Sequence, residues 1–348
     1  MLAPYDWRRN VSAVALAPVL RQLKVMTAPE TLTHIHHRGD EVTGRAPQTT
    51  MLPLEKKHPH YRDKCISFEP LTHTYTVHRS KELREQVPIS VTSFAKDYFK
   101  KFDAKATVDR YYERWKGDAE SKYFHLIHSA LDCGGDTDSA KRAIIDLWDA
   151  NSAEASSNGT KMHADAELLC NGLPPTEESR EMGFLRRWLQ EFQPHMKWQP
   201  ARTEWMLWYE CERDDPISPI LLAGTLDLLM WSETADAYGL FDFKRTNPKP
   251  KRAGGPQHTL GPHTHPLYHP GYAKAPLSQV EDSDFGKYTM QLNILSKMLR
   301  DRYAIDVGEH MYLLQLHPDL QAAHCVQVPM LEDATNTLFK VEEYKLRG

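Results

Sequence analysis

The sequence predicts an α/β protein of the mixed α+β kind, in which a central mixed β-sheet is flanked by helices. Apolar side chains recur at spacings of three and four residues through much of the region before residue 193, which is typical of helices that pack on one face. Apolar runs near 202–210, 220–231 and 238–244 are separated by polar turn segments, which is typical of strands. The 348 residues are 41% hydrophobic, enough for helices and sheet to share one large core.

Local patterns place the other elements. Residues 66–68 and 74–77 are expected to pair as a small hairpin. Ser90 or Thr92 is expected to cap a helix that continues through Phe99. Further helices are expected at 111–115, 140–150, 159–170, 176–192 and 288–300, and the last strands at 311–316 and 325–328.

The chain divides by composition into an N-terminal extension and one domain. Residues 1–60 are rich in Pro, Thr and His and are expected to be poorly ordered, whereas 61–348 form the main domain with an inserted loop at 247–287. Residues 1–26 carry four cations and one acid, a pattern that resembles a mitochondrial presequence. An ordinary N-terminal helix is the alternative, so mitochondrion and nucleus both stay open as compartments.

Cysteine spacing and hydropathy exclude several classes of protein. The five cysteines stand far apart without a Cys-x-x-Cys pair, so we expect no iron–sulfur cluster, and the odd count suits free thiols in an intracellular, reducing compartment. No segment approaches the length of a membrane span, and we expect no membrane partner. We expect a monomer.

Two acids and a lysine lie on neighbouring apolar segments. Asp242 and Lys244 are two residues apart on an expected strand, so both side chains leave the same face of the sheet. Asp227 lies on the preceding strand, and the polar segment between them is expected to form a turn that brings Asp227 beside Asp242. Carboxylates at about 4 Å repel each other, and a hard divalent cation with oxygen ligands is the usual relief. The pattern predicts a magnesium site.

An Asp-x-Lys pattern alone is common on strands, but here it stands in order with further motifs. In chain order they are Ser90-Val91-Thr92, Gly159-Thr160-x-x-His163-x-x-x-Glu167, Gly224-x-x-Asp227, Asp242-x-Lys244-x-Thr246 and the helix that carries Gln291. This set resembles the PD-(D/E)XK nuclease superfamily in its RecB-like branch. It is similar to the mitochondrial genome maintenance exonuclease and to large-virus relatives, which share the opening Ser-Phe-x-x-x-x-His-x-Tyr-Thr at 67–76.

The resemblance implies a restriction-endonuclease-like core with an N-terminal helical layer. It implies a Mg²⁺-dependent deoxyribonuclease, with Mn²⁺ as a substitute, that acts as an exonuclease on single-stranded DNA ends or flaps in DNA maintenance, repair or replication. By position, Asp227, Asp242 and Lys244 are catalytic, and the metal ligands are His163, Asp227, Asp242 and the Phe243 carbonyl. Substrate contacts are expected from Ser90, Thr92, Thr160, Glu167, Arg245, Thr246 and Gln291.

Some alternatives stay open. Glu204 is either an exposed strand residue or an outer metal ligand. Leu295 stands where the family has a tyrosine, which removes a hydroxyl or a stacking ring near the nucleic acid. A catalytically inactive nucleic-acid-binding module on a nuclease scaffold is the second function, and its mark would be binding without turnover. The sequence also leaves DNA or RNA, and the polarity of cleavage, undecided.

Basic and His-rich residues follow the acidic pair. Residues 244–252 carry five cations and no anion, so they predict a local phosphate-binding patch despite the net charge of −4. A solvated loop is the alternative. In the inserted loop, His263, His265 and His269 are compatible with a zinc site or with a loop whose rings stack on unpaired bases.

Overall fold

The computed structural model describes residues 51–78, 87–210, 221–248, 260–262 and 270–345. The chain divides into two compact units, Met1–Thr50 and Met51–Gly348, and only the second contains described residues. This unit begins before the expected boundary at residue 61, because helix α1 (Pro53–Lys57) belongs to it and the Leu54 amide donates to Asn171 Oδ1 at 2.9 Å. The possible presequence within 1–26 lies outside the described residues, as do His263, His265 and His269.

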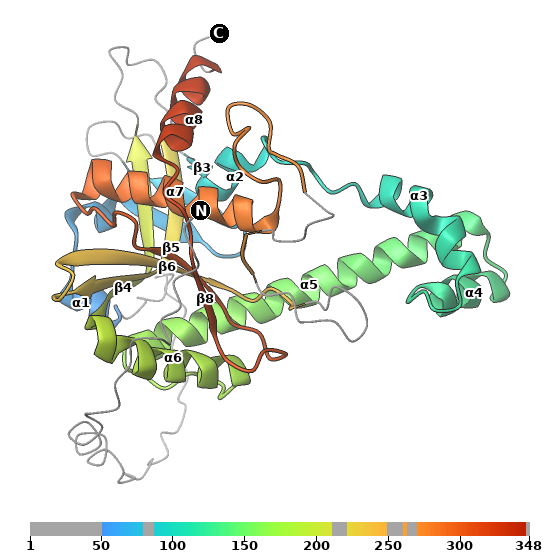
Figure 1. Cartoon of the computed structure of the whole chain (residues 1–348), viewed down its shortest axis with the longest axis horizontal. Helices are drawn as coiled ribbons and strands as arrows, with labels where there is room; N and C mark the ends of the chain where they lie inside the picture. The colour runs from blue at the N-terminus through green and yellow to red at the C-terminus, as the bar shows by residue number, and fades with distance from the viewer. Residues whose placement is uncertain (1–50, 79–86, 211–220, 249–259, 263–269, 346–348) are drawn as a thin grey trace, which may run out of the picture. The chain divides into compact units, whose positions relative to one another are not determined.

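The predicted mixed α/β fold, a central mixed sheet flanked by helices, is confirmed (Figure 1). The described strands are β1 (Ile66–Glu69), β2 (Thr74–Val77), β3 (Ile89–Ser90), β4 (Trp198–Glu210), β5 (Leu221–Ser232), β6 (Ala237–Lys244), β7 (Met311–Gln315) and β8 (His324–Gln327). Strands β1 and β2 form the predicted hairpin. Among the described residues, the other six form one sheet in the order β3-β5-β6-β7-β8, with β4 paired to β5. The β3–β5 and β6–β7 pairs are parallel, and the rest are antiparallel.

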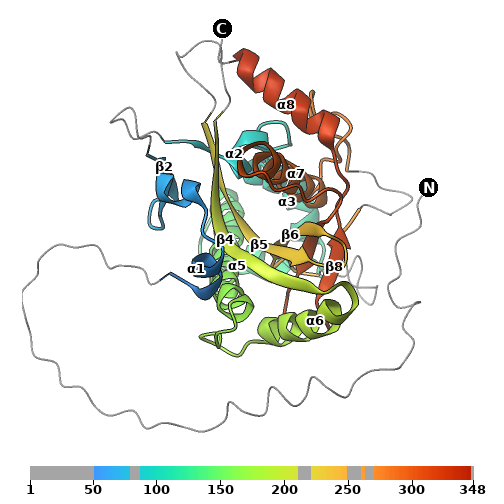
Figure 2. The same ribbon diagram turned by 90° about the vertical axis from the view of Figure 1, so that its left-hand side faces the viewer.

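Helices cover both faces of the sheet, and two further helices pack away from it. Besides α1, the described helices are α2 (Val91–Lys96), α3 (Ala104–Gly117), α4 (Phe124–Asp132), α5 (Thr137–Cys170), α6 (Arg180–Met196), α7 (Asp284–Tyr303) and α8 (Glu332–Lys345), together with a 3₁₀ helix at Tyr61–Cys65. Figure 2 shows α2 and α7 on one side of β5 and β6, and α5 and α6 on the other. No helix in the described part of the chain is long and apolar enough to cross a membrane.

The side chains of β6 alternate between two cores. Leu240 packs in the core that contains α7, whereas Phe241 and Phe243 pack in the core that contains α5 and α6. This is the parity predicted from the sequence. It leaves Asp242 and Lys244 on the face opposite to the two phenylalanines.

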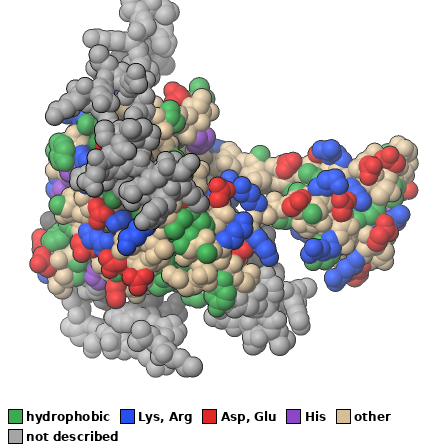
Figure 3. Space-filling view, turned by 90° about the horizontal axis from the view of Figure 1, so that it is seen from above, with side chains coloured by type: hydrophobic (Ala, Val, Ile, Leu, Met, Phe, Trp, Pro, Cys, Tyr) green, Lys and Arg blue, Asp and Glu red, His purple; other side chains and the backbone are tan. Residues whose placement is uncertain are grey.

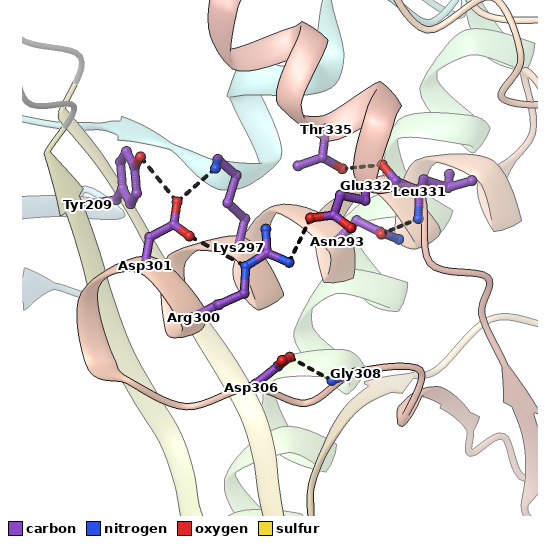
Figure 4. Close-up of polar contacts among 10 residues, drawn as sticks. All are labelled: Tyr209, Asn293, Lys297, Arg300, Asp301, Asp306, Gly308, Leu331, Glu332 and Thr335. Carbon is purple, nitrogen blue, oxygen red and sulfur yellow. Dashed lines mark hydrogen bonds and ion pairs between the residues drawn. The ribbon is translucent and has the colours of Figure 1, made fainter.

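Polar contacts fix α7 against its neighbours (Figure 4). The buried Asn293 accepts a 2.6 Å hydrogen bond from the Leu331 amide, in the segment that leads into α8. Arg300 forms a 3.0 Å ion pair with Glu332 of α8, and within α7 itself Lys297 pairs with Asp301 at 2.7 Å. Because a buried amide is costly without partners, the satisfied Asn293 fixes one orientation of α7.

Three expectations about the elements were wrong. Helix α2 ends at Lys96, so Phe99 lies beyond it. The helices expected at 140–150 and 159–170 are one 34-residue helix, α5, because the polar residues between them lack Pro and remain compatible with a helix. The segment 247–287 was expected to be an inserted loop, yet Ala273, Leu277 and Val280 are buried in the core that contains α7, since a few apolar side chains are hidden by the surrounding composition.

Helices α3 and α4 pack on the first half of α5 around a separate apolar cluster (Figure 1). Tyr112, Ile127 and Ile144, one from each helix, are almost fully buried in this cluster. We call this group of three helices the helical module. Since α5 continues from the module to the sheet, one helix belongs to both.

Gly224 allows a close approach between β5 and α2. A Cβ added there would lie 2.7 Å from Val91 Cγ2, and Val91 is β-branched and therefore stiff. Gly224→Ala should lower the free energy of unfolding by about 1–3 kcal/mol. Gly183→Ala in α6, where a Cβ meets nothing within 4 Å, should raise it by about 0.5–1 kcal/mol. Urea unfolding of both variants tests this contrast, and an undiminished stability of Gly224→Ala would contradict the close packing.

Candidate functional site

The site lies where β5 loses a strand partner on one edge. Strand β4 pairs with the other edge of β5 throughout its length. On the edge opposite β4, β3 pairs with Leu222 and Ala223, and β6 pairs from Leu228 onward. Between these two ladders, residues 224–227 have no strand partner on that edge within the described part of the chain. We call this gap the fork.

The Asp227 carboxylate bridges the two strands of the fork. Its Oδ2 accepts a 2.6 Å hydrogen bond from the backbone N–H of Phe243. The β5–β6 ladder ends earlier, at the pair Leu228–Phe241, so the carboxylate satisfies a buried amide that the ladder does not reach. The structure thereby places Asp227 beside the segment that contains Asp242, as the sequence predicts.

Asp242 is buried, and among the described residues neither of its carboxylate oxygens has a hydrogen-bond donor in good geometry. Lys244 Nζ forms an ion pair with Oδ2 at 2.6 Å, whereas Oδ1 has no such partner. Burial raises the pKa of Asp242 to about 6, although the Lys244 ammonium opposes this shift. A buried carboxylate oxygen without a partner is costly, and a cation would relieve that cost.

His163 of α5 and Glu204 of β4 complete the cluster. His163 Nδ1 lies 3.3 Å from Glu204 Oε1 and 3.6 Å from Asp227 Oδ2. One ligand atom from each of these three residues lies within 4.8 Å of the others. The closest cluster therefore differs from the expected Asp227–Asp242 pair, because Asp242 is engaged by Lys244 instead.

Glu204 has a backbone conformation that side chains seldom adopt. Its φ is +40°, in the middle of β4 between the paired residues Thr203 and Trp205. Such a conformation costs a non-glycine residue on the order of 1–3 kcal/mol, and strain of this kind concentrates at functional sites. The strained backbone turns the Glu204 carboxylate toward His163.

The carboxylates set the charge states of the two cationic groups. Burial disfavours the His163 imidazolium, but Asp227 and Glu204 outweigh it and raise the pKa of His163 to about 9. Burial also opposes the charge of Lys244, yet Asp242 and Asp227 raise the pKa of its ammonium. Burial raises the pKa of Asp227 itself. Three acids thus share two cations, which leaves the site with excess negative charge when all five groups are ionised.

An open hollow of ≈530 Å³ adjoins the cluster. One face of α5, including Thr160, His163 and Glu167, forms it together with Glu204. Burial, with Glu204 as the next cause, raises the pKa of Glu167 to about 7. Two residues expected to contact substrate, Thr160 and Glu167, therefore lie beside the metal-binding candidates.

Helix α7 covers the other side of Lys244. The Lys244 ammonium lies 4.7 Å from the centre of the Tyr288 ring, a cation–π contact. Gln291 follows Tyr288 by three residues and therefore lies on the same helical face, half-buried. Leu295 is buried in the core beside Gly224, so this position does not present a side chain to solvent.

Other expected substrate residues have structural contacts. Ser90 is the N-cap of α2, and its hydroxyl accepts from the Ser93 amide at 3.1 Å; Thr92 is exposed in the first turn. Arg245 forms a 2.9 Å ion pair with the buried Glu181 of α6, and its contact with substrate stays a prediction. The Thr246 hydroxyl is buried and has no hydrogen-bond partner among the residues that the structure describes.

Two residues near the site were not among the predicted site residues. For Glu204 the sequence leaves open an exposed strand residue or an outer metal ligand, because strand alternation gives no sign of its positive φ. Tyr288 is the first residue of an expected helix, and its i, i+3 spacing to Gln291 is the signal that places both side chains on one helical face.

The donor set fits a divalent cation. The clustered carboxylate oxygens of Glu204 and Asp227 suit Mg²⁺, and the His163 imidazole additionally suits Mn²⁺ or another transition metal. Asp242, with an oxygen that lacks a hydrogen-bond donor among the described residues, stays a predicted ligand. The Phe243 carbonyl stays a predicted ligand.

Comparisons with known proteins add little. No protein-family model matches the chain, and no curated protein matches it. The solved structure described as "Crystal structure of SSO0001" aligns over 77% of this chain and 78% of its own, with 15% identity and a TM-score of 0.27. A TM-score this low carries no argument about fold or function.

Cation binding should stabilise the folded protein. Mg²⁺ or Mn²⁺ added after EDTA treatment should raise the midpoint of thermal unfolding, since a ligand at a hundred times its Kd contributes about 2.7 kcal/mol. Asp242→Asn should remove most of this shift, and Asp149→Asn, an exposed position on α5, should retain it. Differential scanning calorimetry measures both, and equal shifts in the two variants would place the cation elsewhere.

Glu167 should make the metal-free protein less stable at alkaline pH. Its folded-state pKa, about 7, exceeds the ordinary value of 4.5, so the folded state binds the proton more tightly. The contribution of Glu167 to the free energy of unfolding is fully present below pH 4.5 and is lost as the pH rises through about 7. Glu167→Gln should therefore raise stability at pH 8 and change it little at pH 5. Urea unfolding in EDTA tests this, with the exposed Glu191→Gln as control; a gain that is equal at both pH values would contradict the assignment.

Proposed function

We propose that this protein is a metal-dependent nuclease of the PD-(D/E)XK superfamily, RecB-like branch. The observation that carries the proposal is the convergence at the fork of Asp227, Asp242 and Lys244, with one Asp242 oxygen buried and without a donor. These are the residues that the motif resemblance assigns to catalysis. Their spatial proximity, together with His163, supports metal-assisted phosphodiester hydrolysis.

Each residue has a distinct task in this proposal. His163, Glu204 and Asp227, whose ligand atoms lie together, would hold the cation. Asp242 and the Phe243 carbonyl are further ligands that the motif resemblance implies. Bound Mg²⁺ supplies a Lewis acid that polarises the phosphate and lowers the pKa of a bound water.

Lys244 is suited to stabilise negative charge rather than to accept a proton. The acids around it raise the pKa of its ammonium, so it stays protonated at neutral pH. A positioned cation in a buried site stabilises charge that develops on the reacting phosphate. The Tyr288 ring and Asp242 hold this ammonium in place from two sides.

The proposed substrate is single-stranded DNA, at free ends or flaps, in DNA maintenance, repair or replication. This choice comes from the motif resemblance. The open hollow supports access for a strand, because Thr160 and the backbone of α5 line it directly beside His163. Access of a strand to this hollow does not require the protein to read a base pair in the groove of a duplex.

Removal of single site residues should abolish turnover without unfolding the protein. Asp242→Asn should lower kcat more than about a hundredfold, since even partners outside the metal shell are worth 10- to 100-fold. Lys244→Ala should lower kcat by about 10²–10³, the usual cost of one transition-state charge contact. The measurement is Mg²⁺-dependent degradation of single-stranded DNA labelled at the 5′ or the 3′ end, with an RNA strand in parallel.

The matched control is Asp149→Asn, which removes an exposed carboxylate on the same helix as His163. Its kcat should equal that of the wild type. Equal activity in Asp242→Asn and wild type would exclude this centre, whereas strand binding without turnover in the wild type would favour the inactive binding module.

A further inference from the structure

A second hollow, of ≈540 Å³, lies in the helical module. The end of α3 and the segment that leads into α4 form it, and aromatic side chains line much of its wall. Tyr111 and Trp115, one turn apart on α3, stack with ring centres 5.6 Å apart and an interplanar angle of 29°. Tyr111 is 37% exposed, so part of this stack faces solvent.

The inner wall of the hollow is rigid. Trp115 contacts Tyr123 at a ring-centre distance of 4.5 Å, and the Trp148 indole N–H donates to the Tyr123 hydroxyl at 2.8 Å. Trp148 belongs to α5, so the aromatic wall is fixed to the helix that also carries His163. A rigid aromatic wall needs little ordering when a flat ring binds to it.

Two cations border the aromatic wall. Arg114 and Lys122 are exposed, and neither forms an ion pair with any described acid. The Lys122 ammonium lies 4.7 Å from the centre of the Tyr123 ring. Asp118 is the acid in the lining, and one of its oxygens accepts from the Glu120 amide. The hollow therefore combines flat apolar rings with excess positive charge.

We propose that this hollow binds an unpaired nucleobase of a single-stranded nucleic acid, with the base stacked on Tyr111 and Trp115 and the adjacent phosphate contacted by Arg114 or Lys122. Aromatic platforms beside cations are the usual means of holding such strands without reading their sequence. The assignment of the strand as substrate rests on the proposed function, but the binding itself does not.

The aromatic wall of the hollow and the fork contact the same helix, α5, through Trp148 and His163 respectively. Trp148 and His163 are separated along α5 by about 22 Å, at a rise of 1.5 Å per residue. A strand in stacked geometry, at about 3.4 Å per nucleotide, would cover this distance with six or seven nucleotides. Figure 3 shows Lys and Arg side chains on the face in view between the larger body and the helical module, and Lys and Arg mixed with Asp and Glu on the module itself.

The direct test measures binding without cleavage. Fluorescence anisotropy in EDTA would compare dye-labelled oligo(dT) of twelve nucleotides with a blunt duplex of equal length. Tyr111→Ala should weaken oligo(dT) binding about tenfold, the loss expected for one stacked base. Arg114→Ala should weaken oligo(dT) binding less than Tyr111→Ala does. It should also reduce the slope of log affinity against log salt concentration by about one, since one fewer counterion is released.

Controls of the same residue types separate a local effect from a general one. Tyr61→Ala removes a tyrosine that is 75% exposed outside the module, and Arg187→Ala removes an exposed arginine of α6. Both should bind oligo(dT) as the wild type does. The inference would be overturned if Tyr111→Ala and Tyr61→Ala had the same affinity for oligo(dT), or if Tyr111→Ala lost as much affinity for the duplex as for oligo(dT). A wild type that does not bind oligo(dT) would also overturn it.

Cleavage gives a second readout that separates this inference from the proposed nuclease. Tyr111→Ala should raise KM for a twelve-nucleotide strand with kcat unchanged, and should leave a trinucleotide unaffected because it is too short to reach both places. If the protein binds strands through Tyr111 but never cleaves them, the inference stands and the nuclease proposal fails. If cleavage occurs but KM for the long strand is unchanged in Tyr111→Ala, the inference fails and the nuclease proposal stands.

Discussion

The hydrogen bond from the Phe243 amide to the Asp227 carboxylate is the contact on which the candidate site depends. It holds β5 and β6 at the point where their ladder has ended, and so it keeps a gap open inside an otherwise continuous sheet. If the ladder continued, backbone groups would pair with each other and no carboxylate would be needed there. The core can contain a polar site here because the Asp227 carboxylate, and not a backbone carbonyl of β5, accepts the hydrogen bond from the Phe243 amide.

The neighbouring elements then supply charge from several directions. Helix α5 brings His163, β4 brings Glu204, and β6 brings Asp242 and Lys244. The carboxylates lie close to one another in a poorly solvated place, which is unfavourable unless cations are shared. Strain at Glu204 and the unpaired oxygen of Asp242 both belong to this arrangement. Such costs are common where a protein retains residues for chemistry rather than for stability.

The sequence was sufficient for those parts of the site that depend on strand parity. Asp242 and Lys244 face away from Phe241 and Phe243 because alternation is a strict property of strands. Glu204 could not be placed in this way, since its positive φ depends on tertiary contacts and not on local pattern.

Composition and motif position were less reliable guides. The segment 247–287 is predicted to be a loop, yet its Leu277 is fully buried, because membership of a core depends on single side chains. The motif predicts a substrate contact for Arg245 but gives no sign of its ion pair with Glu181 on α6, because that contact depends on tertiary packing. The fold class was accessible because it depends on the order of long elements.

Helix α5 contains a weak point beside the site. Gly159 lies in its interior, where glycine stabilises a helix less than other residues do, and most of residues 151–158 are exposed without packing that would keep the axis straight. Gly159 is also about one turn from His163. A bend of α5 would therefore cost least at Gly159, and it would change the position of the His163 imidazole relative to the helical module.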